Sequence, residues 1–94
     1  MLLLPKLRPV TFRFSSTLAP GARRVAVVGP FNGWDPTVHP LVPTVAGNWT
    51  ITVFLPPGRL VYCFVVDGVS RPDPNVQARL LNGRGSEYSV CDIL

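Results

Sequence analysis

Apolar and polar side chains alternate with a period of two along much of the chain. Residues 10–14 and 49–53 alternate apolar side chains with threonine or arginine, which is typical of strands that bury one face. Residues 25–28 and 60–66 are continuously apolar and rich in β-branched or aromatic side chains, which indicates strands that are buried more deeply. Shorter segments complete a set of about seven expected strands, and they cover residues 41–42, 69–71 and 88–93.

Turn-forming residues separate these segments and leave no room for a helix. Asp67-Gly68 signals a tight turn directly after residues 60–66, because both residue types tolerate the backbone of a two-residue hairpin loop. The 11 prolines interrupt the remaining stretches, and no window of about a dozen residues shows helical spacing. The sequence therefore predicts an all-β fold, an antiparallel β-sandwich. Its longest stretches without strand signals are residues 29–40 and 71–86.

Length and composition narrow the range of functions. A chain of 94 residues that is 47% apolar fits a single domain over residues 1–94 and is too short for the large catalytic folds. The net charge is +4, but the arginines are scattered apart from Arg23-Arg24, so no nucleic-acid surface is predicted. The apolar start, residues 1–4, is too short to span a membrane.

Two cysteines and one histidine indicate neither a zinc site nor a disulfide framework, so no metal or other cofactor is expected. Cys63 and Cys91 lie in strands that could be neighbours, and we interpret both as small buried apolar side chains. Reduced thiols are the default in the cytoplasm, which is the expected location. Because the chain starts at Met1 and ends one residue past the last expected strand, we also expect a free-standing module.

Four short motifs follow one another in a specific order. They are Val-Ala-Val-Val-Gly-Pro-Phe-Asn-Gly-Trp at 25–34, Leu-Pro-Pro-Gly at 55–58, Tyr-Cys-Phe-Val-Val-Asp-Gly at 62–68 and Pro-Asp-Pro at 72–74. Together they resemble the glycogen- and starch-binding module of the AMP-activated protein kinase β subunit and of glycogen branching and debranching enzymes. The resemblance covers about residues 22–93. It implies an early-set immunoglobulin-like sandwich that carries no catalysis and binds α-1,4-glucan or maltooligosaccharides.

A glucose ring has an apolar face and a rim of hydroxyl groups, so its site needs a flat aromatic side chain and a few fixed polar groups. Trp34 matches the first stacking tryptophan of the family that the chain resembles, although it could instead plug the end of the sandwich. Asn32 and Asp35 flank it, and Asp35 either caps the loop or accepts a sugar hydroxyl. Trp49 is in phase with Ile51 on its strand and is predicted to belong to the core.

The sequence departs from the family pattern at two positions. Where the glucan-binding members have a lysine donor and a second stacking tryptophan, this chain has Cys63 and Ser70. These losses predict weak binding. Replacement contacts could come from residues just before and within the last expected strand. Asn82, Arg84 and Ser86 either supply polar contacts or form an ordinary solvated turn. Tyr88 either supplies a second aromatic side chain or faces inward. The predicted carbohydrate-binding residues are thus Trp34, Asn32, Asp35, Ser70, Asn82, Ser86 and Tyr88.

Catalysis is not expected. Glycoside hydrolysis needs two facing carboxylates, and we assign Asp67 to its turn and Asp73 to the Pro-Asp-Pro bend. His39 has no nucleophile near it in the sequence, so we interpret it as a solvated loop residue.

A second hypothesis is a degenerate sandwich that serves protein interaction or oligomerisation without binding sugar, through open edge strands and Leu2, Leu3 and Leu4. Under the first hypothesis, the expected partners besides glucan are a glucan-active enzyme or a second copy of the chain. The two hypotheses differ in the position of Trp34. If a glucan site persists, an aromatic side chain such as Tyr88 or Phe31 faces Trp34, and if the site is lost, Trp34 turns into the core.

Overall fold

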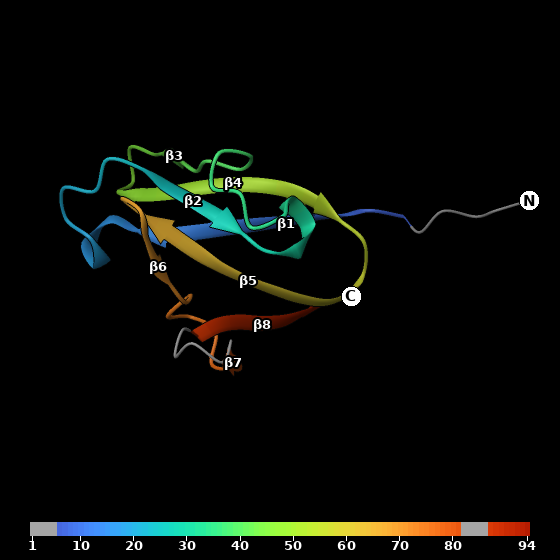
Figure 1. Ribbon diagram of the computed structural model, residues 1–94. Coiled ribbons are helices and arrows are strands. Elements are labelled where there is room, and N and C mark those ends of the chain that lie inside the picture. Colours follow the sequence, from blue (N-terminus) through green and yellow to red (C-terminus); the bar gives the residue numbers. More distant parts are fainter. Residues whose placement is uncertain (1–5, 82–86) are drawn as a thin grey trace, which may run out of the picture.

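Two antiparallel sheets pack face to face in the computed structural model, which describes residues 6–81 and 87–94 (Figure 1). The predictions for Leu2, Leu3, Leu4, Asn82, Arg84 and Ser86 lie outside the described residues. The first sheet has the strand order β1-β4-β3, with bounds Arg8–Ser15, Asn48–Leu55 and Val42–Pro43.

The second sheet has five strands. Its order is β2-β5-β8-β7 with β6 also paired to β5, and the bounds are Val25–Val28, Gly58–Val66, Glu87–Ile93, Arg79–Leu81 and Val69–Arg71. Two short 3₁₀ turns, η1 at Ser16–Leu18 and η2 at Pro30–Asn32, are the only helical segments in the described part of the chain. The prediction of an all-β immunoglobulin-like sandwich is confirmed.

The expected strands are present, with two differences. β7 lies inside residues 71–86, where we expected no strand. It forms because Leu80 pairs with Tyr88 of the next strand, β8, a pairing that three residues without alternation do not reveal. The strand expected at 41–42 shifts to Val42–Pro43 because Leu41 is buried and its N–H donates to the Val25 carbonyl at 2.7 Å.

The core lies between the two sheets and follows the period-two pattern. Phe12 and Phe14 of β1 contact Tyr62 and Phe64 of β5 edge to face, with ring centroids 5.0 and 5.3 Å apart. This is a favoured arrangement for aromatic pairs. Trp49 is half-buried and packs against the same cluster, in agreement with its predicted place.

The turn between β5 and β6 has the geometry that its sequence predicts. Asp67 and Gly68 have φ values of 47° and 84°, the pair of positive values that a type I′ hairpin requires. The Asp67 carboxylate also accepts the N–H groups of Arg23 and Arg24 at 2.9 and 2.8 Å. Asp67 is therefore structural, and it connects the β5–β6 turn to the start of β2.

A buried polar cluster attaches residues 72–75 to the second sheet. The Tyr62 hydroxyl donates to Asp73 Oδ2 at 2.7 Å, and the Asp73 N–H donates to Ser89 Oγ at 2.7 Å. The N–H of Asn75 donates to the other carboxylate oxygen of Asp73 at 2.9 Å. Burial, together with the neighbouring Asp73 carboxylate, raises the pKa of Tyr62 far above its usual value. Asp73 thus has the structural role that the sequence predicts.

Both cysteines are free, although β5 and β8 are indeed neighbours. Cys91 pairs with Leu60 and packs against the core. Cys63 lies between the core residues Tyr62 and Phe64, so it points to the other side of the sheet. A disulfide between side chains on opposite faces would require the backbone to move.

Within residues 6–81 and 87–94, no helix is long and apolar enough to cross a membrane. The described residues also contain no group of three or more potential metal ligands.

Candidate functional site

The candidate site lies on the outer face of the five-stranded sheet, meaning the side turned away from the three-stranded sheet. Because Tyr62 and Phe64 point into the core, their neighbour Cys63 points outward. Ser89 is buried and pairs with Tyr62, so Tyr88 points outward and lies beside Cys63 across the β5–β8 pair. Cys63 is only 1% exposed, so this part of the outer face is covered by other side chains.

The loop after β2 starts at a position that accepts only glycine. A Cβ atom at Gly29 would lie 2.5 Å from the Val61 carbonyl oxygen, so any side chain would push the loop away from β5. The Gly29 carbonyl then accepts the N–H groups of Asn32 at 3.1 Å and Trp34 at 3.0 Å. These contacts hold the loop close to the outer face.

The Asn32 side chain is engaged inside this loop, which differs from the sugar-contacting role that we expected. Its Oδ1 accepts the Gly29 N–H at 3.1 Å, and its Nδ2 donates to the Val27 carbonyl at 2.9 Å. Nδ2 also lies 2.9 Å from His39 Nδ1. Both amide hydrogens are thus directed to protein acceptors, and Asn32 shapes the loop. The prediction of a solvated His39 is corrected in the same way, because His39 is half-buried and bonded.

Trp34 is turned outward. Gly33 and Trp34 both adopt left-handed backbone, with φ values of 66° and 60°, and this conformation is unfavourable for a bulky residue. The indole stays 37% exposed and is absent from the core cluster. A strained backbone that presents a large aromatic side chain to solvent is a feature of binding sites more than of packing.

Tyr88 is the aromatic residue that faces Trp34. Their ring centroids are 4.5 Å apart, with an angle of 34° between the planes. Phe31 has a different position, because it packs on Phe12 at 6.1 Å and lies 5.7 Å from the His39 ring. The structure therefore brings together two of the predicted site residues, one from the loop after β2 and one from β8. Tyr88 points outward, not inward as in the alternative.

Asp35 caps the loop that carries Trp34. Its Oδ1 accepts the Thr37 hydroxyl at 2.7 Å and the Thr37 N–H at 2.9 Å. These two hydrogen bonds hold the pKa of Asp35 below its usual value, with the hydroxyl contributing most. Asp35 thus caps the loop, which is the first of the two roles that we considered for it. Its carboxylate is exposed, and the residue directly follows Trp34 in the sequence.

Cys63 and Ser70, at the two positions that depart from the family pattern, contact each other. Burial raises the pKa of the Cys63 thiol, and the nearby Ser70 hydroxyl offsets part of this rise. Cys63 therefore stays neutral and offers no charged donor. Ser70 is exposed and pairs with Val65, so it remains on the outer face without supplying an aromatic wall.

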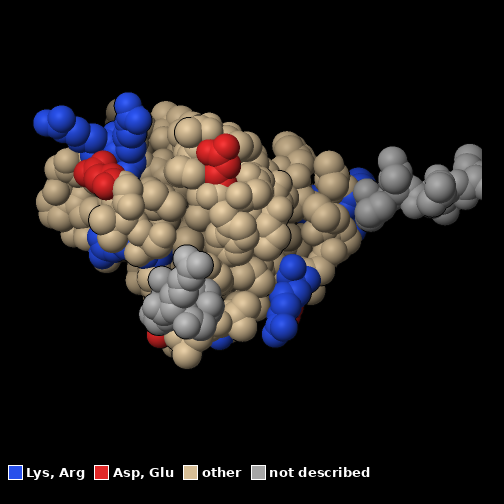
Figure 2. All heavy atoms as spheres, in the orientation of Figure 1, with Lys and Arg blue, Asp and Glu red and all other residues tan. Residues whose placement is uncertain are grey.

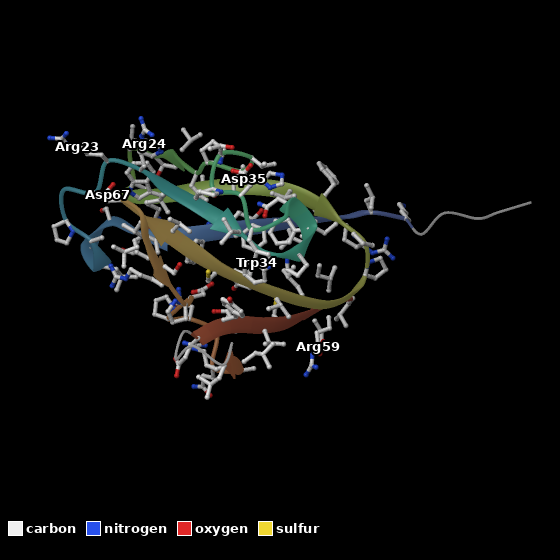
Figure 3. All side chains as sticks on the ribbon, in the orientation of Figure 1. Arg23, Arg24, Trp34, Asp35, Arg59 and Asp67 are labelled. Atoms are coloured by element: carbon white, nitrogen blue, oxygen red, sulfur yellow. The ribbon has the colours of Figure 1, made fainter. Side chains whose placement is uncertain are left out.

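Most charged side chains lie at the borders of the visible face. In Figure 2 the face is mostly uncharged, and comparison with the same view in Figure 3 places Arg23, Arg24 and Asp67 at one end and Arg59 near the other. Asp35 lies above Trp34 in this view. An outward-facing aromatic pair, of which Trp34 is exposed and Tyr88 half-buried, within a mostly uncharged surface suits a neutral ligand that has an apolar face.

Comparisons with known proteins agree with this chemistry. Residues 8–93 match the family described as the glycogen recognition site of AMP-activated protein kinase. The match begins before residue 22 and thus includes β1, which we had left outside the resemblance.

Curated relatives are similar over shorter stretches. The 1,4-alpha-glucan branching enzyme GlgB 2 of Xanthomonas oryzae pv. oryzae is 55% identical over 38 residues, which is 40% of this chain and 5% of the enzyme. The branching enzyme GlgB of Methylococcus capsulatus is 45% identical over 53 residues, 54% of this chain and 7% of the enzyme. The chain thus matches only a small part of these relatives.

Proposed function

Because the chain belongs to the family of the glycogen recognition site of AMP-activated protein kinase, we propose that it is a non-catalytic module that binds α-1,4-glucan. The observation that supports this most strongly is the outward-facing pair of Trp34 and Tyr88. A sugar ring would place its apolar C–H face on this pair, and its hydroxyl rim would reach polar groups around it.

The residues around the pair would have different roles. Asn32 would position Trp34 through its bonds to the loop backbone. Ser70 would offer an exposed hydroxyl, and Asp35, which is exposed, would accept a sugar hydroxyl beside Trp34. Asn82 and Ser86 stay predictions as polar contacts.

We further propose that the affinity is low. An aromatic stacking contact is worth about 0.5–3 kcal/mol, and about 1.4 kcal/mol corresponds to a tenfold change in affinity. Tyr88 would restore part of the stacking surface lost at Ser70. Its ring is tilted against Trp34 and already contacts it, so the two rings form one platform and not two separate walls. No lysine replaces the donor lost at Cys63.

The partner that we propose is a glucan-active enzyme, since the relatives are named as branching enzymes. One observation favours the second hypothesis, protein interaction without sugar binding. Phe54 and Val42 of the three-stranded sheet are 63% and 61% exposed, and such exposed apolar side chains are typical of contact surfaces. A cytoplasmic location stays a prediction.

Calorimetric titration with maltotriose and β-cyclodextrin tests the proposal. Trp34→Ala and Tyr88→Ala should each weaken binding about tenfold or more while the protein stays folded. Phe54→Ala, which removes an exposed aromatic ring from the other sheet, is the matched control and should bind like the wild type. Absence of binding at millimolar sugar, or loss of binding in Phe54→Ala alone, would contradict the proposal.

A further inference from the structure

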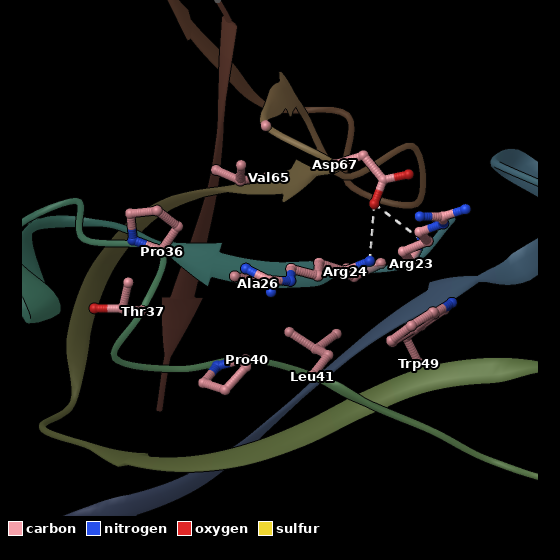
Figure 4. A pocket seen from close by; sticks show the side chains of 12 residues that line it. Arg23, Arg24, Ala26, Pro36, Thr37, Pro40, Leu41, Trp49, Val65 and Asp67 are labelled. Carbon is pink, nitrogen blue, oxygen red and sulfur yellow. Dashed lines mark hydrogen bonds between the residues drawn. The ribbon is translucent and has the colours of Figure 1, made fainter. Parts of the chain in front are cut away.

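A hollow of about 480 Å³ lies beside the loop that carries Trp34. Its lining includes Pro36 and Thr37, which follow Trp34 and Asp35 in the loop, and Ala26, Val65 and Trp49. Figure 4 shows Pro36 and Thr37 at one end and Asp67 with the two arginines at the other. The hollow is open to solvent, and most of its wall is apolar.

Part of the hollow continues the outer face on which the aromatic pair lies, whereas Val25, Leu41 and Trp49 line its other side. Val65 follows Cys63 by two positions on β5, so both point outward and their Cα atoms are about 7 Å apart. Ala26 pairs with Val65 and points to the same side. A ligand that rests on Trp34 and Tyr88 can therefore extend along β5 toward Val65 without leaving this face of the sheet.

Arg24 supplies the hollow with a charged donor. It precedes Val25, which points into the core, so the Arg24 side chain points outward like Ala26. In Figure 4 it extends along β2 toward Ala26, whereas Arg23 points away. Among the donor groups of Arg24, only the backbone N–H has a side-chain partner within the described residues. That partner is the Asp67 carboxylate, at 2.8 Å. The guanidinium group, with its five N–H donors, is left available to a ligand.

We propose that this hollow is a second glucan subsite, in which Arg24 donates hydrogen bonds to the hydroxyl groups of a glucose unit that lies beyond the one stacked on Trp34. The inference rests on the proposed function and adds to it a preference for longer chains. Pro36, Ala26 and Val65 form the apolar wall for the sugar ring, and Arg24 and Thr37 contact its hydroxyl rim. The guanidinium takes the place of the charged donor that is missing at Cys63.

The test compares maltotriose with maltoheptaose by calorimetry, in the whole chain and in two arginine variants. Arg24→Gln removes the donor of the hollow. Arg59→Gln is the matched control, because Arg59 precedes Cys63 by four positions and lies about 14 Å away in the opposite direction along β5. We expect Arg24→Gln to weaken maltoheptaose binding about tenfold, as for loss of a charged hydrogen bond, and to leave maltotriose binding unchanged.

The two tryptophans report on the two subsites separately. The chain has only Trp34 and Trp49, and Trp49 lines the hollow. In Trp34→Phe, maltoheptaose should change the fluorescence of Trp49, and maltotriose should not. If both sugars bind the wild type with equal affinity, or if Arg59→Gln weakens maltoheptaose binding and Arg24→Gln does not, the second subsite is refuted and the proposed function stands. If neither sugar binds, the proposed function fails as well.

Discussion

Replacing Asn32 with alanine should destabilise the fold, because this side chain connects three separate points of the chain. The substitution removes its hydrogen bonds to the Gly29 N–H, the Val27 carbonyl and the His39 ring. Each hydrogen bond contributes about 0.5–1.5 kcal/mol net. Asn32 is half-buried, so water can replace part of the loss, and we expect a decrease of about 2–4 kcal/mol in the free energy of unfolding.

This loss is large for a domain of 94 residues. At about 4–8 °C per kcal/mol it lowers the melting temperature by about 8–32 °C, which circular dichroism measures directly. Asn75→Ala is the matched control. Within the described residues, Asn75 is hydrogen-bonded only through its backbone N–H, so this substitution should change the melting temperature little. A melting temperature of Asn32→Ala equal to that of the wild type, combined with a loss of glucan affinity, would refute the positioning role and make Asn32 a direct ligand.

Three further predictions concern other groups. Tyr62→Phe leaves the buried Asp73 carboxylate without its hydroxyl donor and should lower the free energy of unfolding by about 1–3 kcal/mol in urea titrations; an unchanged midpoint would contradict the buried cluster. The pKa of Asp35 is lowered by Thr37, so the cap of the loop is complete above the ordinary carboxyl pKa of about 3.9 and is lost as the pH falls through the lower folded value. An NMR titration of Asp35 should show this loss, and Thr37→Val should raise the pKa of Asp35 toward the ordinary carboxyl value of about 3.9. Burial raises the pKa of Cys63, so iodoacetamide should label it slowly in the native protein and rapidly in urea; equal rates would show that the thiol is accessible.

The strands could be predicted from the sequence because their signals are local. Alternation marked residues 10–14 and 49–53, and the Asp67-Gly68 pair marked the hairpin, since both depend on neighbours along the chain. β7 could not be predicted in this way. Arg79–Leu81 shows no alternation, and the strand exists because β8 offers it a pairing edge.

The site could be predicted only in part. The loop sequence around Trp34 predicts this residue as the first aromatic side chain of the proposed site, but the choice between Tyr88 and Phe31 as its partner depends on how the loop folds over the sheet. Phe31 is held by Phe12 of the other sheet, a contact that no local pattern predicts. The hydrogen bonds of Asn32 inside the loop were not predicted because its partners include His39, and only the folded loop places the two side chains together.

The central claim is that glucan binds at Trp34 and Tyr88 on the outer face of the five-stranded sheet. An NMR titration of the ¹⁵N-labelled chain with maltotriose tests this most directly, because it reports binding and location together. The claim predicts saturable shifts of the Trp34 indole and of the backbone amides of residues 29–38 and Tyr88, while the amide of Phe54 on the other sheet stays unchanged. Shifts centred on Phe54, or a spectrum unchanged at millimolar maltotriose, would contradict it.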